Sequence, residues 1–203
     1  MRTKVFLIAL GLISASTNLK AQDEGSKFQF GLKVAPTFAW ITSDDVETAG
    51  GKIGFAYGLI GDYHFTKNYA LGTGIDVTYR GGNVESLNDK GEKTDIGVSL
   101  QYIELPVTMK LMTNEIGYIT YYGQFGFAPG VNIKAKSDGE SFKSSVSPFN
   151  LALLVGLGAE YSLGGRTALT GGIKFNNGFL DYIKKKDVKG TSSFIALEIG
   201  VMF

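Results

Sequence analysis

The chain of 203 residues has no cysteine, a single histidine, a single tryptophan and only four prolines. Without cysteine it forms no disulfide scaffold, thiolate metal site or thiol nucleophile, and no lipid anchor of the kind attached to an N-terminal cysteine. Its 20 basic residues nearly balance 19 acidic ones, so the basic field that gathers nucleic acid is absent. Four prolines are too few for a disordered or collagen-like chain. These absences leave a folded protein whose composition alone does not reveal a function.

The first 21 residues have the layout of a secretory signal peptide. Arg2 and Lys4 form a basic start, residues 5–13 are apolar, and small and polar residues follow as far as Ala21. The alternative, an N-terminal membrane anchor, is disfavoured because the apolar run is too short to span a bilayer as a helix. We expect cleavage after Ala21, which leaves 17 basic and 19 acidic residues in the mature chain, residues 22–203.

Apolar residues alternate with small or polar residues through most of the remaining chain. Because successive side chains of a strand face opposite sides, each alternating run predicts a strand with one apolar face. Eight runs follow this pattern, at residues 28–40, 53–65, 69–80, 96–111, 119–134, 149–163, 169–176 and 195–203. No stretch has the period of a helix.

The fourth run is irregular. Ile96, Val98 and Leu100 place its apolar residues at even numbers, whereas from Ile103 onward they have odd numbers. This switch predicts a β-bulge near Gln101–Tyr102, with Leu100 on the apolar face.

The connections between the predicted strands alternate between short and long. Three are tight turns, at residues 66–68, 113–115 and 164–166, and four are long and polar, at residues 40–51, 81–95, 135–148 and 177–190. Antiparallel neighbours joined in this way place every short turn at one end and every long loop at the other, as in outer-membrane barrels. The predicted fold is all-β, an eight-stranded antiparallel up-and-down transmembrane β-barrel with both termini on the periplasmic side.

Such a barrel either hides its apolar face inside, as lipocalins do, or shows it to lipid. The polar face is mostly Gly, Ala, Thr and Ser, which suits a narrow interior, and aromatic residues gather at strand ends, where they can form interfacial girdles. Charges on the polar face nearly balance, and an unpaired buried charge is costly. We therefore predict lipid outside and a lumen charge network of Lys33, Arg80, Lys110, Lys174, Asp62, Asp76, Glu104, Glu160 and Glu198.

Four short segments, in this order, resemble the PorT-like outer-membrane β-barrel family. They are the Ala-Gln at the end of the signal-peptide segment, residues 21–22, FGLKV at residues 30–34, YIELPV at 102–107 and GVMF at 200–203. The layout more distantly resembles the barrel of outer membrane protein A, and the likeness covers residues 27–203. The resemblance implies an outer-membrane location, contact with outer-membrane lipid and lipopolysaccharide, and recognition of the terminal Phe203 by the barrel-assembly machinery.

His64 is the one candidate for acid–base catalysis. Barrels that modify lipid A would use a histidine with a serine at the outer rim, where their substrate lies. His64 instead lies two residues from the turn at 66–68, which is at the periplasmic end. We interpret it as structural and predict no enzymatic activity, no catalytic residues and no cofactor.

Two charged clusters lie in predicted external loops. Lys184, Lys185, Lys186 and Lys189 could meet lipopolysaccharide phosphates, although a solvated charge run is the simpler interpretation. Asp44, Asp45 and Glu47 supply carboxylates for a hard cation, but their spacing fits no known loop, so we predict no metal site.

An eight-stranded barrel is just wide enough for its own side chains. The leading hypothesis is therefore a monomeric barrel with a filled lumen, which presents four external loops in a structural or interaction role. One alternative is a narrow channel for ions or small solutes, with a path past Lys33, Glu104 and Lys110. Another is a part in protein secretion.

Overall fold

A computed structural model of the chain describes residues 27–43, 48–87, 93–137, 140–141, 147–179 and 190–203. The predicted signal peptide, residues 1–21, lies outside these ranges. The described residues form the strands β1 (Phe28–Ser43), β2 (Thr48–His64), β3 (Tyr69–Leu87), β4 (Lys93–Glu104), β5 (Val107–Met112), β6 (Ile119–Ser137), β7 (Glu140–Ser141), β8 (Phe149–Gly164), β9 (Thr167–Gly178) and β10 (Gly190–Met202). Among these residues no helix is long and apolar enough to cross a membrane.

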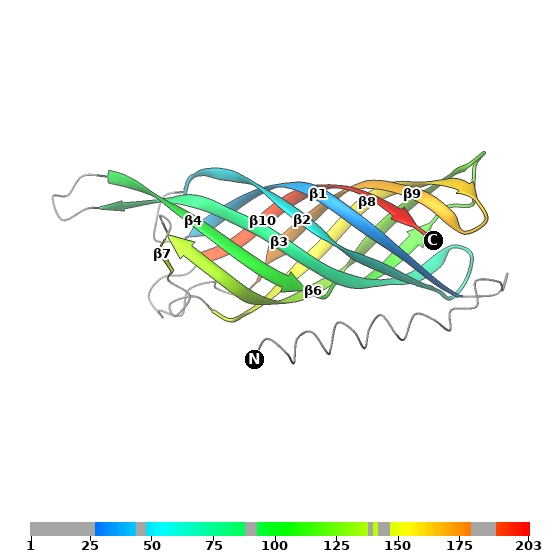
Figure 1. The fold of residues 1–203 in the computed structure, drawn as a ribbon, viewed down its shortest axis with the longest axis horizontal. Coiled ribbons are helices and arrows are strands. Elements are labelled where there is room, and N and C mark those ends of the chain that lie inside the picture. Colours follow the sequence, from blue (N-terminus) through cyan, green and yellow to red (C-terminus); the bar gives the residue numbers. More distant parts are fainter. Residues whose placement is uncertain (1–26, 44–47, 88–92, 138–139, 142–146, 180–189) are drawn as a thin grey trace, which may run out of the picture.

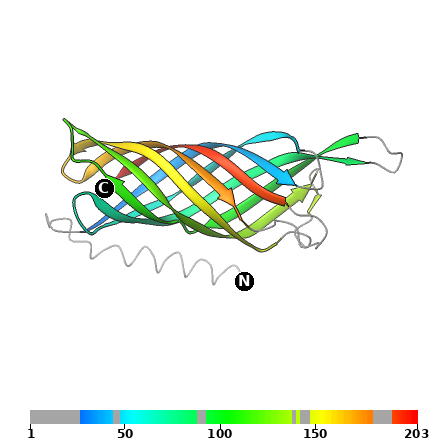
Figure 2. The same ribbon diagram turned by 180° about the vertical axis from the view of Figure 1, so that it is seen from behind.

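The strands close into one antiparallel barrel (Figures 1 and 2). β1 pairs with β2 on one side and with β10 on the other, so the first and last strands complete the ring. β4 and β5 share one place in the ring, because both pair with β3 and with β6, and the two-residue β7 only extends β6 at its edge. The predicted closed barrel of eight strands is confirmed.

The fourth predicted strand is interrupted, which corrects the single run at 96–111. β4 ends at Glu104 and β5 begins at Val107. Between them lies Pro106, which has no backbone N–H to donate to a neighbouring strand. The N–H of Leu105 donates to the carbonyl of Pro129 at 2.9 Å, so β6 still holds the break in place.

The predicted bulge is present, but the extra residue lies on the facing strand. In the pairing of β4 with β6, Tyr102 faces Asn132 and Gln101 faces Lys134, which leaves Ile133 as the additional residue of β6. A bulge of this kind moves one residue out of the alternation and reverses the faces of the residues beyond it.

This bulge overturns two predicted side-chain directions. Asn132 and Ala135 are both buried in the lumen, so Lys134 between them turns outward and is exposed, although its run predicts the polar, inner face. On β4 the alternation continues without a switch, and Leu100 is 2% exposed inside the barrel rather than on the apolar outer face.

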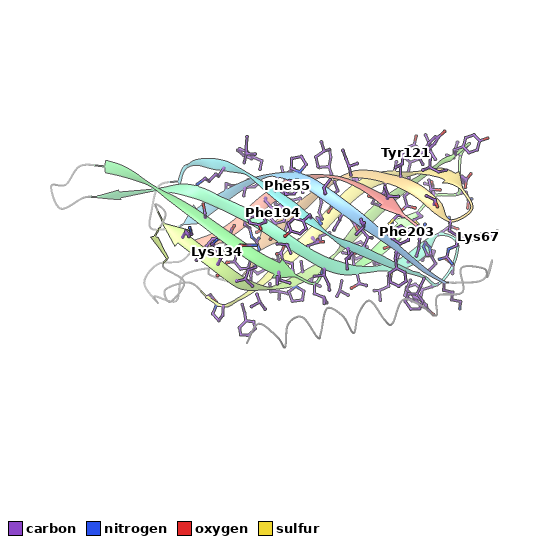
Figure 3. All side chains as sticks on the ribbon, in the orientation of Figure 1. Phe55, Lys67, Tyr121, Lys134, Phe194 and Phe203 are labelled. Atoms are coloured by element: carbon purple, nitrogen blue, oxygen red, sulfur yellow. The ribbon has the colours of Figure 1, made fainter. Side chains whose placement is uncertain are left out.

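Elsewhere the apolar face is outside, which confirms the predicted orientation. In β5 the exposed fractions of Val107 and Met109 are 42% and 38%, whereas those of Thr108 and Lys110 are 3% and 4%. Figure 3 shows side chains covering the outer wall, with Phe194 inside, Lys67 at one end and Lys134 toward the other.

The two ends of the barrel differ. At the short-turn end, residues 65–68, 113–118 and 165–166 connect the strands, and the backbones of Phe30 and Phe203 exchange hydrogen bonds of 3.1 and 2.7 Å. At the opposite, long-loop end the strands extend further than predicted. β3 runs to Leu87 and β4 begins at Lys93, inside the predicted loop 81–95, because the antiparallel ladder continues as far as Leu87 and Lys93.

Candidate functional site in the barrel lumen

The charged residues predicted for the lumen lie on the inner face in three groups. Nearest the short-turn end is a triad, in which Lys110 of β5 lies between Asp62 of β2 and Glu160 of β8. The ammonium group of Lys110 donates to a carboxylate oxygen of Asp62 at 2.6 Å and to one of Glu160 at 2.5 Å. It also lies 4.4 Å from the ring centroid of Tyr122, within cation–π range.

The second group, further along the axis, is a closed quartet of two cations and two carboxylates. Lys33 of β1 contacts Asp76 of β3 at 2.9 Å and Glu198 of β10 at 3.0 Å. Lys174 of β9 contacts the same Asp76 at 3.4 Å and the same Glu198 at 2.5 Å. Each cation therefore meets both acids, and the quartet is formally neutral while it links four strands across the lumen.

The third group is a pair in the part of the lumen nearer the long loops. The guanidinium of Arg80 donates to Glu104 at 2.8 Å, and both side chains are almost fully buried, at 1% and 2% exposed. The Arg80 guanidinium carbon also lies 4.2 Å from the ring centroid of Tyr102 and 5.2 Å from that of Phe194. Two aromatic faces thus compensate part of the hydration that this cation loses.

These groups stabilise a barrel that must bury charge. An ion taken out of water costs several kcal/mol, and that cost is offset only when oppositely charged partners lie within hydrogen-bond distance. The quartet and the pair are neutral, whereas the triad carries one cation and two carboxylates and therefore a formal charge of −1. The triad is the part of the network most sensitive to losing its cation.

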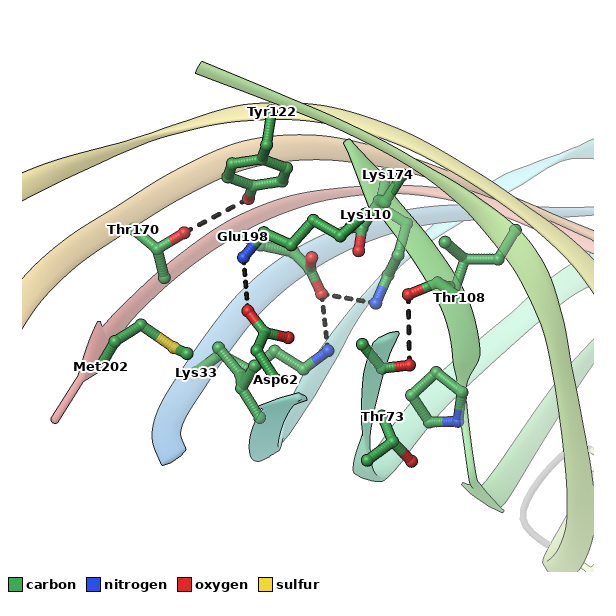
Figure 4. A pocket seen from close by; sticks show the side chains of 15 residues that line it. Lys33, Asp62, Thr73, Thr108, Lys110, Tyr122, Thr170, Lys174, Glu198 and Met202 are labelled. Carbon is green, nitrogen blue, oxygen red and sulfur yellow. Dashed lines mark hydrogen bonds and ion pairs between the residues drawn. The ribbon is translucent and has the colours of Figure 1, made fainter. Parts of the chain in front are cut away.

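A small cavity lies between the triad and the quartet (Figure 4). The volume open to the centres of water molecules is about 40 Å³. The lining residues include Lys33, Asp62, Lys110, Lys174 and Glu198. One water needs roughly 10–15 Å³ by this measure. The cavity therefore has room for a few waters and not for a larger solute.

Several large side chains that the alternation pattern does not assign to a face lie in the lumen and fill it. Phe194 is 1% exposed and packs with a patch of alanines from β1, β2 and β10, namely Ala35, Ala39, Ala56 and Ala196. Tyr102, Leu154 and Met202 are also buried. Each has the same number parity as a lumen-facing acid of its own strand, Glu104, Glu160 or Glu198. This shared parity predicts the inward direction, because position in the alternation rather than polarity decides which face a side chain takes.

Glycine makes room for the largest of these rings. A Cβ on Gly158 would lie 2.4 Å from the Tyr122 ring, and one on Gly172 would lie 2.9 Å from the Tyr122 hydroxyl. Tyr122 therefore crosses the lumen over two glycines, and its hydroxyl lies 3.3 Å from that of Thr170. Part of the chain's content of 28 glycines thus serves lumen packing.

The remaining sequence candidates form no reactive arrangement within the described segments. His64 is the last residue of β2, at the short-turn end. Its backbone N–H donates a hydrogen bond to the carbonyl of Lys27, and its buried Nε2 has no hydrogen-bond partner among the described residues. No three His, Asp or Glu side chains of the described ranges are grouped to hold a metal. The predicted loop clusters lie outside those ranges, namely Asp44, Asp45 and Glu47, and Lys184, Lys185, Lys186 and Lys189.

The barrel is similar to solved outer-membrane barrels. Neisserial surface protein A aligns over 85% of this chain and 95% of its own, with a TM-score of 0.56 at 16% identity. OprG of Pseudomonas aeruginosa aligns over 88% and 97%, with a TM-score of 0.54 at 10% identity. These identities establish the fold and no more. Among the curated proteins compared, none matches the chain.

A family model agrees with the structural neighbours. It describes an outer membrane protein β-barrel domain and matches residues 20–202, which include every described strand. The outward apolar wall, the ion-paired lumen and this match together place the protein in the cell outer membrane. The chain belongs to the outer membrane protein β-barrel domain family.

Proposed function

We propose that this barrel is a non-conducting anchor that presents its long loops at the cell surface in a structural or interaction role. The observation that carries the proposal is the filled lumen. Three ion-paired groups occupy successive levels of the barrel, with Tyr102 and Phe194 beside the Arg80 of the third, and the cavity between the triad and the quartet accommodates only a few waters. A barrel closed in this way supplies a rigid base for loops rather than a path for solutes.

The wild-type protein is expected to show no steady conductance in planar lipid bilayers, because side chains fill the lumen at several levels. A known porin reconstituted under the same conditions serves as the positive control. A steady large conductance would contradict the proposal. It would favour the alternative, a narrow channel whose path passes Lys33, Glu104 and Lys110.

We further propose the surroundings and partners of the mature barrel. The signal peptide, residues 1–21, is removed on export, and the barrel resides as a monomer among outer-membrane lipid and lipopolysaccharide. The exposed C-terminal Phe203, which follows apolar residues at alternate positions, supports recognition by the barrel-assembly machinery. No cofactor and no nucleic acid take part.

Membership of the PorT-like branch, with a part in protein secretion, stays a narrower proposal supported by the order of the sequence motifs. Absence of enzymatic activity is likewise a proposal. It is supported by the position of His64 at the short-turn end, away from the long loops.

A further inference from the structure

The bulge on β6 creates an outward-facing polar patch that the alternation of the sequence conceals. Beyond Ile133, Lys134 and Lys136 both face outward and are exposed, while Ala135 between them is fully buried. Neither lysine forms an ion pair with another described residue. Two ammonium groups therefore leave the outer wall of the barrel close together, toward its long-loop end, where Figure 3 places Lys134.

The neighbouring strands add hydrogen-bonding groups in register. Gln101 of β4 faces Lys134 across the ladder, and Ser99 faces Lys136. The ammonium group of Lys52 in β2 donates to the Ser99 hydroxyl at 3.3 Å. We call these residues the lysine patch: Lys52, Lys134, Lys136, Ser99 and Gln101.

On β4 and β6 the lysine patch lies just beyond the outward-facing Ile103, Val131 and Ile133. Val131 and Ile103 lie beside each other on the lipid face at 44% and 42% exposed. Lys134 lies two ladder positions beyond Val131, because the bulged Ile133 adds no full step, and at about 3.4 Å a position and a tilt near 40° this places it roughly 5 Å further along the axis. From this position the long lysine side chain reaches the level of the lipid headgroups.

We propose that the lysine patch is a binding site for the phosphate groups of outer-leaflet lipid, that is, of lipid A. Lys134 and Lys136 lie in register with Gln101 and Ser99, the Lys52 ammonium group contacts the Ser99 hydroxyl, and phosphate accepts hydrogen bonds from all of these groups. Each lysine close to an anionic lipid surface strengthens binding by about fivefold. The inference rests on the proposed orientation, in which the long loops face the cell exterior.

The test compares two double variants that lose the same charge at opposite ends. Lys134→Gln with Lys136→Gln removes most of the lysine patch, whereas Lys27→Gln with Lys67→Gln removes two exposed lysines at the short-turn end. Binding of lipid A with two phosphates, and of the same lipid with one phosphate removed, is measured by native mass spectrometry. The patch variant is expected to bind bisphosphorylated lipid A at least tenfold more weakly, and the control variant within about twofold of wild type.

Three outcomes would overturn the site. They are equal losses in the two variants, no loss in either, and binding that ignores the second lipid phosphate. Inorganic phosphate alone is expected to give no adduct, and tight binding of it would point to a free-anion site instead. Wild-type conductance reports separately on the filled lumen, so that proposal and this one fail independently.

The orientation of the barrel is checked separately with single-cysteine variants in intact cells. Because the chain lacks cysteine, Lys136→Cys and Lys67→Cys each introduce a unique thiol. A membrane-impermeant maleimide is expected to label the first on intact cells and the second only after the outer membrane is permeabilised. The reverse pattern would place the lysine patch against the inner leaflet and overturn the assignment to lipid A.

Discussion

Replacing Lys110 by Met is expected to destabilise the barrel by about 3–5 kcal/mol, because the change leaves two buried carboxylates without a cation. Asp62 and Glu160 both depend on the Lys110 ammonium group, and their side chains are only 3% and 11% exposed. The free energy of unfolding can be measured by urea titration in lipid vesicles, with the single Trp40 as the fluorescent probe.

Two controls make the Lys110 result specific. Neutralising the partners in the triple variant Lys110→Met, Asp62→Asn, Glu160→Gln is expected to restore most of the stability, because no uncompensated charge remains. Lys67→Met removes an exposed lysine from the turn at 65–68 and is expected to change stability by less than about 0.5 kcal/mol. Equal effects of the two single changes would mean that the triad does not stabilise the lumen.

Placing an arginine on the middle of the outer wall is the second change with a large expected effect. Leu157 lies half-way along β8 and is 70% exposed. Leu157→Arg is expected to cost about 2–4 kcal/mol at the bilayer midplane. The matched change Leu163→Arg, near the short-turn end of the same strand, is expected to cost about 0–1 kcal/mol because its guanidinium reaches the headgroups.

This comparison separates a lipid-facing wall from a water-facing one. In water an arginine at either position would be tolerated equally, since both leucines are exposed. The measurement is again urea unfolding in vesicles, supported by the fraction of each variant that inserts. A Leu157→Arg barrel as stable as its Leu163→Arg counterpart would contradict hydrocarbon contact at Leu157.

The fold could be predicted from sequence because a barrel has one simple constraint, the alternation of faces. Strands such as β5 obey it residue by residue, so number parity alone assigns Val107 outward and Lys110 inward. The constraint also predicts the lumen-facing charges, because a charge on the lipid face would be costly. It predicts none of the pairings, since strand tilt and stagger decide which charges share a level.

The errors arose where one residue disturbs the ladder. Pro106 cannot donate a hydrogen bond, and β4 and β5 separate beside it. The extra Ile133 reverses the faces of the residues beyond it. The sequence alone does not show whether the extra residue lies on β4 or on the facing strand β6. The apolar character of Leu100 predicts an outward side chain, although its number parity matches that of the buried Glu104. Apolar residues that fill a lumen cannot be recognised from hydrophobicity.

The most direct test of the central claim, an apolar wall in lipid around a charged interior, uses tryptophan fluorescence. Trp40 is the single tryptophan, so Trp40→Phe gives a background in which Leu157→Trp or Phe194→Trp places one probe on the outer wall or in the lumen. In vesicles of lipids brominated along their acyl chains, strong quenching of the Leu157→Trp probe and little quenching of the Phe194→Trp probe are expected. Quenching of the lumen probe with an unquenched wall probe would contradict the orientation on which the proposed function and the lipid site depend.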